Sequence, residues 1–131
     1  MNQQIGWATN DLQTSESHLT TGVGDSNDSY GFNPFCGAKW HGGKTRWGKT
    51  LQRSKGGYVG VALDTVKGEV WFSVNGNWNE PNGIAFNGVD TKDQFFPALS
   101  GDYATLEVNF GDREFRYGPP TSGFVKLIDV L

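Results

Sequence analysis

Two neighbouring stretches of the chain, each alternating between apolar and small or polar residues, constrain its fold most strongly. Between Tyr58 and Asp64 every second residue is Val or Leu, and the residues between them are Gly and Ala. Between Glu69 and Asn75 the alternation resumes with Val, Phe and Val. A period of two is that of a β-strand with one buried face, and Thr65–Gly68 is short enough to join two antiparallel strands. The pattern predicts a β-hairpin whose small residues leave room for a second, covering sheet.

Further strand patterns follow this hairpin, separated by turn residues. Asn75-Gly76 is suited to a tight reversal because both residues tolerate positive φ. Ile84–Phe86 is expected to form a short strand. Phe95–Ser100 and Ala104–Phe110 are expected to pair with each other, with the Leu, Val and Phe of the second strand pointing inward.

The spacing of these strands indicates the fold class. No helical period separates them, and no repeat, linker or low-complexity tract divides the chain. Repeated short strands without helical spacers are typical of a sandwich. We therefore expect one all-β domain over residues 1–131, built from two antiparallel sheets, with less than about a tenth of its residues in helix. The side chains expected to be largely buried are Trp7, Trp40, Val61, Leu63, Phe72, Val108 and Phe110.

Composition narrows the setting in which such a domain works. The formal net charge of -3 argues against nucleic-acid binding, which usually needs a basic surface. The lone Cys36 cannot form an intramolecular disulfide, so no oxidising compartment is required. No apolar run is long enough to span a membrane, and Met1–Gln4 lacks the layout of a signal peptide. A cytoplasmic location without membrane insertion is the expectation.

Four short sequence motifs occur in an order and with a spacing that resemble those of a known family. They are Gly22–Phe32 with its Gly-Asp turn, Lys39-Trp-His-Gly42, Tyr58–Asp64 and Asn109-Phe-Gly111. Together they resemble a SPRY domain, from about Gln4 to Leu127, and most resemble those within ryanodine receptors and large RING or HECT ubiquitin ligases. The resemblance implies a concanavalin-like β-sandwich that acts as a non-catalytic protein-interaction module, for example as an adaptor in a ubiquitin ligase.

The chain departs from the SPRY pattern in two places. Family members begin with one or two more strands before Ile5-Gly-Trp-Ala8, whereas only four residues precede it here. We expect the first strands to be missing, so that the domain is part of a larger chain or is completed by another strand at an exposed sheet edge. The Asn77–Gly83 stretch is also longer than the usual turn, which favours specialised contacts there.

The resemblance also implies where a partner binds. In SPRY domains with known peptide sites, the contacts come from the loop before the Gly-Asp turn and from a loop between two late strands. By motif alignment the partner-binding residues are Leu19, Thr20, Thr21, Ser100, Gly101, Asp102 and Tyr103, with Trp78 at the rim. An alternative interpretation, equally compatible with the residue types, is that these residues only close turns.

Catalytic and metal sites are poorly supported by the residues. Cys36 and His41 lack a marked Asn or Asp orienter, so a packed Cys is the better interpretation. Zinc would need further ligands, and His18 is the only other soft candidate. A calcium loop over Asp25–Ser29 fails because Tyr30 and Cys36 stand where Gly and Glu are needed. We expect no catalytic residues, metal or cofactor.

Carbohydrate-active sandwiches are the main rival class. A retaining glycosidase needs two facing carboxylates about 5 Å apart, and Glu69 and Glu107 are single outward carboxylates. A lectin remains open as the alternative to protein binding. Its sugar-stacking candidates would be Trp47, Trp78 and Tyr103, and its hydroxyl-binding amides Asn77, Asn79 and Asn82.

Overall fold

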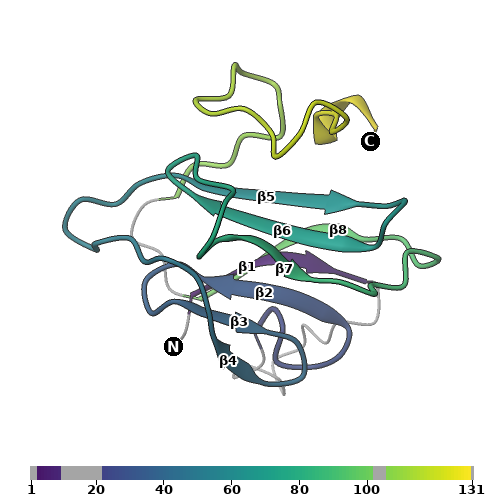
Figure 1. The fold of residues 1–131 in the computed structure, drawn as a ribbon, viewed down its shortest axis with the longest axis horizontal. Helices are drawn as coiled ribbons and strands as arrows, with labels where there is room; N and C mark the ends of the chain where they lie inside the picture. The colour runs from purple at the N-terminus through teal and green to yellow at the C-terminus, as the bar shows by residue number, and fades with distance from the viewer. Residues whose placement is uncertain (1–2, 10–21, 102–105, 131) are drawn as a thin grey trace.

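A computed structural model describes residues 3–9, 22–101 and 106–130 and has the expected two-sheet architecture (Figure 1). One antiparallel sheet has the order β4-β3-β2-β1-β8 and the other the order β5-β6-β7. The strands of the first sheet are β1 (Gln4–Ala8), β2 (Ser29–Asn33), β3 (Ala38–Trp40), β4 (Lys44–Arg46) and β8 (Phe96–Ser100). Those of the second are β5 (Val59–Asp64), β6 (Glu69–Val74) and β7 (Gly83–Phe86). The described helix is a single 3₁₀ turn, η2 (Leu127–Asp129), so the all-β expectation is confirmed.

The β5–β6 hairpin forms as its alternation predicts. Val61 pairs with Phe72, and both point into the sandwich, whereas Ala62 and Trp71 pair on the outer face. The Asp64 carboxylate accepts hydrogen bonds from the amides of Val66 and Lys67, which holds the turn between the strands.

The reversal after β6 is also confirmed. Asn75 and Gly76 have φ of 52° and 82°, the left-handed conformation that these residue types tolerate. Strand β7 follows, paired antiparallel to β6.

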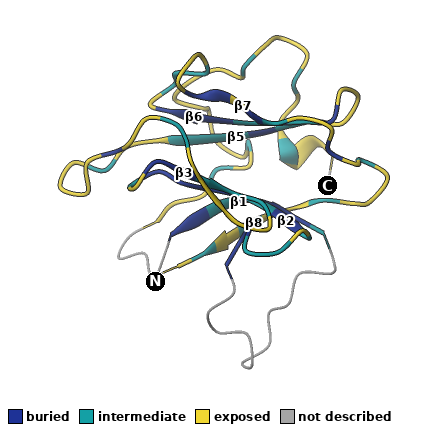
Figure 2. Cartoon of the chain, turned by 60° about the horizontal axis from the view of Figure 1, so that its bottom comes forward, coloured by how far each residue is buried: buried dark blue, intermediate teal, exposed yellow. Residues whose placement is uncertain are grey.

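The core lies between the two sheets, where the dark blue strands of Figure 2 face one another. Phe32 and Phe72 are fully buried and stack with their ring centroids 5.2 Å apart. Trp7 is buried as expected. Trp40, Val61 and Leu63 are only half-buried. The central strands are therefore well covered, and the ends of the sandwich are less so.

The prediction of a strand at Ala104–Phe110 is wrong for its described part. Residues 106–110 form no strand, and Val108 and Phe110 are exposed rather than buried. Strand β8 pairs with β1 instead, Leu99 lying opposite Ile5. Among the described strands β8 is an edge of its sheet, and its Phe96 and Leu99 are exposed.

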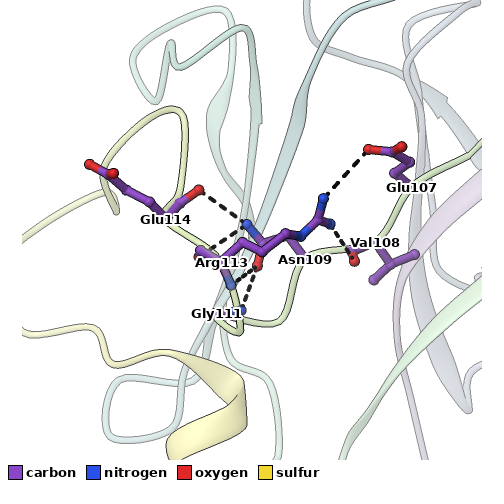
Figure 3. Close-up of polar contacts among 6 residues, drawn as sticks. All are labelled: Glu107, Val108, Asn109, Gly111, Arg113 and Glu114. Carbon is purple, nitrogen blue, oxygen red and sulfur yellow. Dashed lines mark hydrogen bonds and ion pairs between the residues drawn. The ribbon is translucent and has the colours of Figure 1, made fainter.

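The Asn109 side chain binds backbone groups of the chain directly after residues 106–110, which favours a turn there (Figure 3). Its Oδ1 accepts from the amides of Gly111 and Arg113, and its Nδ2 donates to the carbonyls of Arg113 and Glu114. The Arg113 guanidinium donates to the Val108 carbonyl. Local bonds thus turn the chain at the Asn-Phe-Gly phrase, where sequence alternation alone suggested a straight strand.

The face carrying Gly60 and Ala62 is covered, but not by a sheet. Ala62 and Ser73 are buried on the outer face of β5 and β6. The irregular residues 111–130, which we call the C-terminal segment, lie over this face (Figure 1). Figure 1 shows this segment on the side of β5 and β6 away from the five-stranded sheet. The small residues do leave room, and the occupant is the irregular C-terminal segment.

Candidate functional site

The expected partner-binding residues fall only partly within the described chain. Ser100, Gly101 and Trp78 are described. The expectations for residues 19–21, 102 and 103 lie outside the described residues. The geometry of this site therefore comes from the segments that flank the two loops.

The described ends of these two loops are hydrogen-bonded to each other. The amide of Val23 donates to Ser100 Oγ at 2.8 Å, a contact across 77 positions of sequence. Gln4, which pairs with Ser100 on β1, donates from its Nε2 to the Val23 carbonyl at 2.8 Å. Val23, just after the first loop, and Ser100, just before the second, therefore meet at one corner of the five-stranded sheet.

The Gly-Asp turn makes this corner rigid. Gln4 Nε2 also donates to Asp25 Oδ1 at 2.9 Å, and the other oxygen of Asp25 accepts from the amide of Gly22. Gly24 has a φ of 94°, and a Cβ there would collide with Trp40. The amide of Gly24 donates to Ser29 Oγ at 2.6 Å. The amides of residues 22–25 thus each have a defined partner, which holds the turn in place after the first loop.

Gln4 is the residue that sequence reasoning missed at this corner. It is only 2% exposed, its side-chain amide connects β1 to the Gly-Asp turn, and its backbone pairs with Ser100 of β8. A single Gln near the start of a chain has no spacing that marks it. The one sequence feature that could have pointed to Gln4 was its position directly before the Ile5–Ala8 strand. Only the folded chain brings Val23 and Ser100 next to Gln4.

Trp78 lies in the loop between β6 and β7 of the other sheet. Its ring packs beside Gly60 on the outer face of β5, where a Cβ would come within 2.7 Å of the indole. Its Nε1 donates to the Gly118 carbonyl at 2.9 Å. Trp78 thus contacts the C-terminal segment and is not brought together with Ser100 and Gly101.

The Trp-His phrase contributes to an aromatic cluster at the edge of the core. The His41 ring stacks on Tyr30 with centroids 3.9 Å apart, and its Nδ1 lies 3.0 Å from the Ser29 carbonyl. Lys39 Nζ donates to the Ala85 carbonyl at 2.7 Å and lies over the Phe86 ring, so it joins β3 to β7. Burial lowers the pKa of Lys39. The contacts of Lys39 with β7 help to hold the two sheets together.

Tyr30 makes the stability of this cluster sensitive to alkaline pH. Burial, with the nearby Asp90 carboxylate as the smaller cause, raises the pKa of Tyr30 above 10.0. The fold therefore favours the neutral phenol, and its contribution is complete below pH 10 and is lost as the pH rises further. We expect Tyr30→Phe to reduce the fall in urea midpoint between pH 9 and pH 11. Tyr58→Phe, at an exposed position, is the matched control. Its urea midpoint should fall between pH 9 and pH 11 by as much as that of the wild type.

The structure also places some of the residues considered for catalysis or metal binding, whereas His18 lies outside the described residues. Cys36 is exposed in the turn after β2, while one nitrogen of His41 faces the Ser29 carbonyl. Within the described ranges, no group of three or more His, Cys, Asp or Glu side chains could hold a metal ion. In the same part of the chain, no helix is long and apolar enough to cross a membrane.

Three of the residues considered for sugar binding have side chains engaged within the protein, and Tyr103 lies outside the described residues. Asn82 is 4% exposed, and its Oδ1 accepts from the amide of Lys49. Asn77 accepts from the amide of Asn79. Trp47 packs edge-on against the Phe32 ring. These contacts give each side chain a structural role.

Comparison with known proteins agrees with the fold. The family model described as SPRY domain matches residues 2–113. A relative named E3 ubiquitin-protein ligase RKP, from Arabidopsis thaliana, is 32% identical over 129 residues, which cover 95% of this chain and 9% of the relative. The chain therefore corresponds to a small part of that much longer protein. With its two-sheet sandwich and a family match over most of its length, the chain belongs to the SPRY domain family.

Proposed function

We propose that this SPRY domain binds a short segment of a partner protein through residues Leu19–Thr21 and Ser100–Tyr103. SPRY domains are protein-interaction modules, and this chain carries the family's sandwich. The finer proposal concerns which surface makes the contact and what it contacts. No chemical step is involved: affinity would come from side chains held by a rigid sheet.

The observation that most supports this surface is the hydrogen bond from Val23 to Ser100, reinforced by buried Gln4. It ties the end of one loop to the start of the other. Two segments 77 positions apart can then contribute to one continuous binding surface. Because these attachment points are fixed before binding, less conformational entropy is lost when a partner docks.

A role in a larger assembly is part of the proposal. The relative from Arabidopsis thaliana is named as an E3 ubiquitin-protein ligase, and this chain matches 9% of it. We propose that the domain supplies a partner contact to a ubiquitin ligase of this kind, while the transfer chemistry belongs to other parts of such a protein.

Tyr103 provides the test of the surface. Peptides selected from a random peptide library on the wild-type domain should bind Tyr103→Ala more weakly by about 2 kcal/mol, or roughly 30-fold, because truncating an aromatic interface anchor typically has that effect. Isothermal titration calorimetry with a selected peptide measures this difference. The free energy of unfolding should change by less than about 0.5 kcal/mol.

Val66→Ala is the control for this comparison, since Val66 is 93% exposed in the turn between β5 and β6. It should bind the selected peptide as the wild type does. Equal peptide affinity in wild type and Tyr103→Ala would contradict the proposal. A glycan array that captures the wild type, with no peptide selected, would favour the lectin alternative.

A further inference from the structure

Three Asn-Gly steps lie within residues 75–88, and the fold gives each of them a different environment. They are Asn75-Gly76, Asn82-Gly83 and Asn87-Gly88. Elsewhere in the chain every Asn is followed by a larger residue. Asn is a thermally labile residue, and a following Gly makes deamidation easiest, because its amide nitrogen can reach the Asn side chain without hindrance from a Cβ. The fold therefore decides which of the three steps reacts.

Asn82 is protected by burial. It is 4% exposed, and its Oδ1 accepts a hydrogen bond from the Lys49 amide at 2.7 Å. Its own amide donates to the Asn79 carbonyl at 2.9 Å. A Cβ on Gly83 would lie 2.5 Å from the Trp78 carbonyl, so the backbone is also tightly packed after Asn82. The Asn82 side chain can therefore turn toward the Gly83 amide only when this part of the fold opens.

Asn75 is exposed, but its contacts hold it in place. Its amide donates to the Tyr58 carbonyl at 2.8 Å, and its Oδ1 accepts from the Tyr58 amide at 3.0 Å. A Cβ on Gly76 would collide with the Tyr117 ring, so the turn is crowded as well. Deamidation of Asn75 would require the bond to its Oδ1 to break and the crowded turn to rearrange.

Asn87 has neither kind of protection. Asn87 and Gly88 are both exposed, and among the described residues neither the Asn87 side chain nor the Gly88 amide has a hydrogen-bond partner. Gly88 has a φ of 65°, and apart from its chain neighbours no heavy atom lies within 4 Å of the position that a Cβ would occupy. The Asn87 side chain and the Gly88 amide are therefore free to approach each other, and solvent reaches both.

From this comparison we propose that Asn87-Gly88 is a modification site at which the folded domain deamidates spontaneously. The Gly88 amide nitrogen gives its proton to hydroxide and forms a bond to Cγ of Asn87. The bond between Cγ and Nδ2 breaks, and Nδ2 takes a proton from water and leaves as ammonia, which regenerates the hydroxide. Water then opens the succinimide ring at either carbonyl, which gives Asp or isoaspartate. The reaction needs water and its hydroxide, and it involves no change of oxidation state.

The product changes a segment that is anchored on both sides. Isoaspartate adds a methylene group to the main chain between Phe86 and Val89. Phe86 packs edge-on against Tyr30 with ring centroids 5.1 Å apart, and Val89 is 6% exposed in the core. The new carboxylate also lies three positions before that of Asp90. Deamidation thus adds a negative charge and alters the spacing between two packed side chains.

The test follows the three steps in one experiment. The folded chain is aged in a mildly alkaline buffer and then digested with trypsin. Residues 68–92 form a single tryptic peptide that carries all three steps, so electron-transfer fragmentation measures their conversion side by side and separates isoaspartate from Asp. Asn87 should convert at least about tenfold faster than Asn82 or Asn75, because each of those must first lose its contacts.

The digested peptide, aged in the same buffer, is the matched control, since all three steps are equally free in it and should convert at similar rates. A second control is Asn87→Gln, an exposed position without side-chain contacts among the described residues. This variant should not accumulate the more acidic form that anion-exchange chromatography detects in the aged wild type. The inference is overturned if the three steps convert equally in the folded chain, or if Asn87→Gln becomes acidic as fast as the wild type.

Discussion

Replacing Phe72 with Ala is expected to destabilise the domain by about 3–5 kcal/mol, the usual cost of truncating a buried Phe. Phe72 has no exposed surface and lies at the centre of the sandwich, stacked on Phe32 and packed edge-on against Trp47. Removing the ring leaves a cavity between two sheets that are each held by hydrogen-bonded ladders. The sheets cannot close the gap without disturbing their neighbours, so most of the cost should persist.

Urea denaturation followed by tryptophan fluorescence measures this loss. Val66→Ala, which removes apolar atoms at a 93% exposed position, should stay within about 0.5 kcal/mol of the wild type. A Phe72→Ala midpoint close to that of Val66→Ala would mean that the two sheets do not pack through this ring.

Gly6→Ala is the second change with a large expected effect. Gly6 lies in β1 between β2 and β8, opposite Gly31. A Cβ at Gly6 would collide with the backbone carbonyl of Tyr30, which is part of the neighbouring strand and cannot rotate away. Relief requires β1 and β2 to separate, so we expect a loss of about 3 kcal/mol, at the upper end of the range for overpacked cores.

Gly43→Ala separates this steric effect from the general effect of replacing a glycine. No heavy atom lies within 4 Å of the position that a Cβ on Gly43 would occupy. It should therefore leave the urea midpoint within about 0.5 kcal/mol of the wild type or raise it slightly, because Ala restricts the unfolded chain. Equal midpoints for Gly6→Ala and Gly43→Ala would contradict the close approach of β1 and β2.

Gly31, the cross-strand neighbour of Gly6, connects the sheet with the proposed binding corner. Gly6 and Gly31 are cross-strand neighbours, and a Cβ on Gly31 would collide with the Val23 carbonyl. The Gly-Asp turn can therefore approach β2 this closely only because Gly31 has no side chain. If a variant stayed folded but its Gly-Asp turn were displaced, the attachment point of the first loop would move, although no residue of that loop had changed.

Local pattern was sufficient for most of the strands. The alternation over Tyr58–Val74 predicts the hairpin because each strand there has one buried face and because Asp64 and Asn75 form turns through their own side chains and backbone. The four SPRY-like motifs likewise indicate the sandwich. Their glycines and aromatic residues are needed at those positions by the turns and the core.

Interactions between distant residues decided the remaining features. Residues 106–110 alternate like a strand, yet Asn109 binds the backbone just beyond it and the alternate residues stay exposed. The binding corner depends on Gln4, Val23 and Ser100, which have no common sequence pattern. The sequence by itself determined which face of a strand is buried, because the period of two in its apolar residues predicts that face. This period does not record which strand becomes the neighbour or what covers an outer face, because those depend on contacts that form only when the whole chain packs.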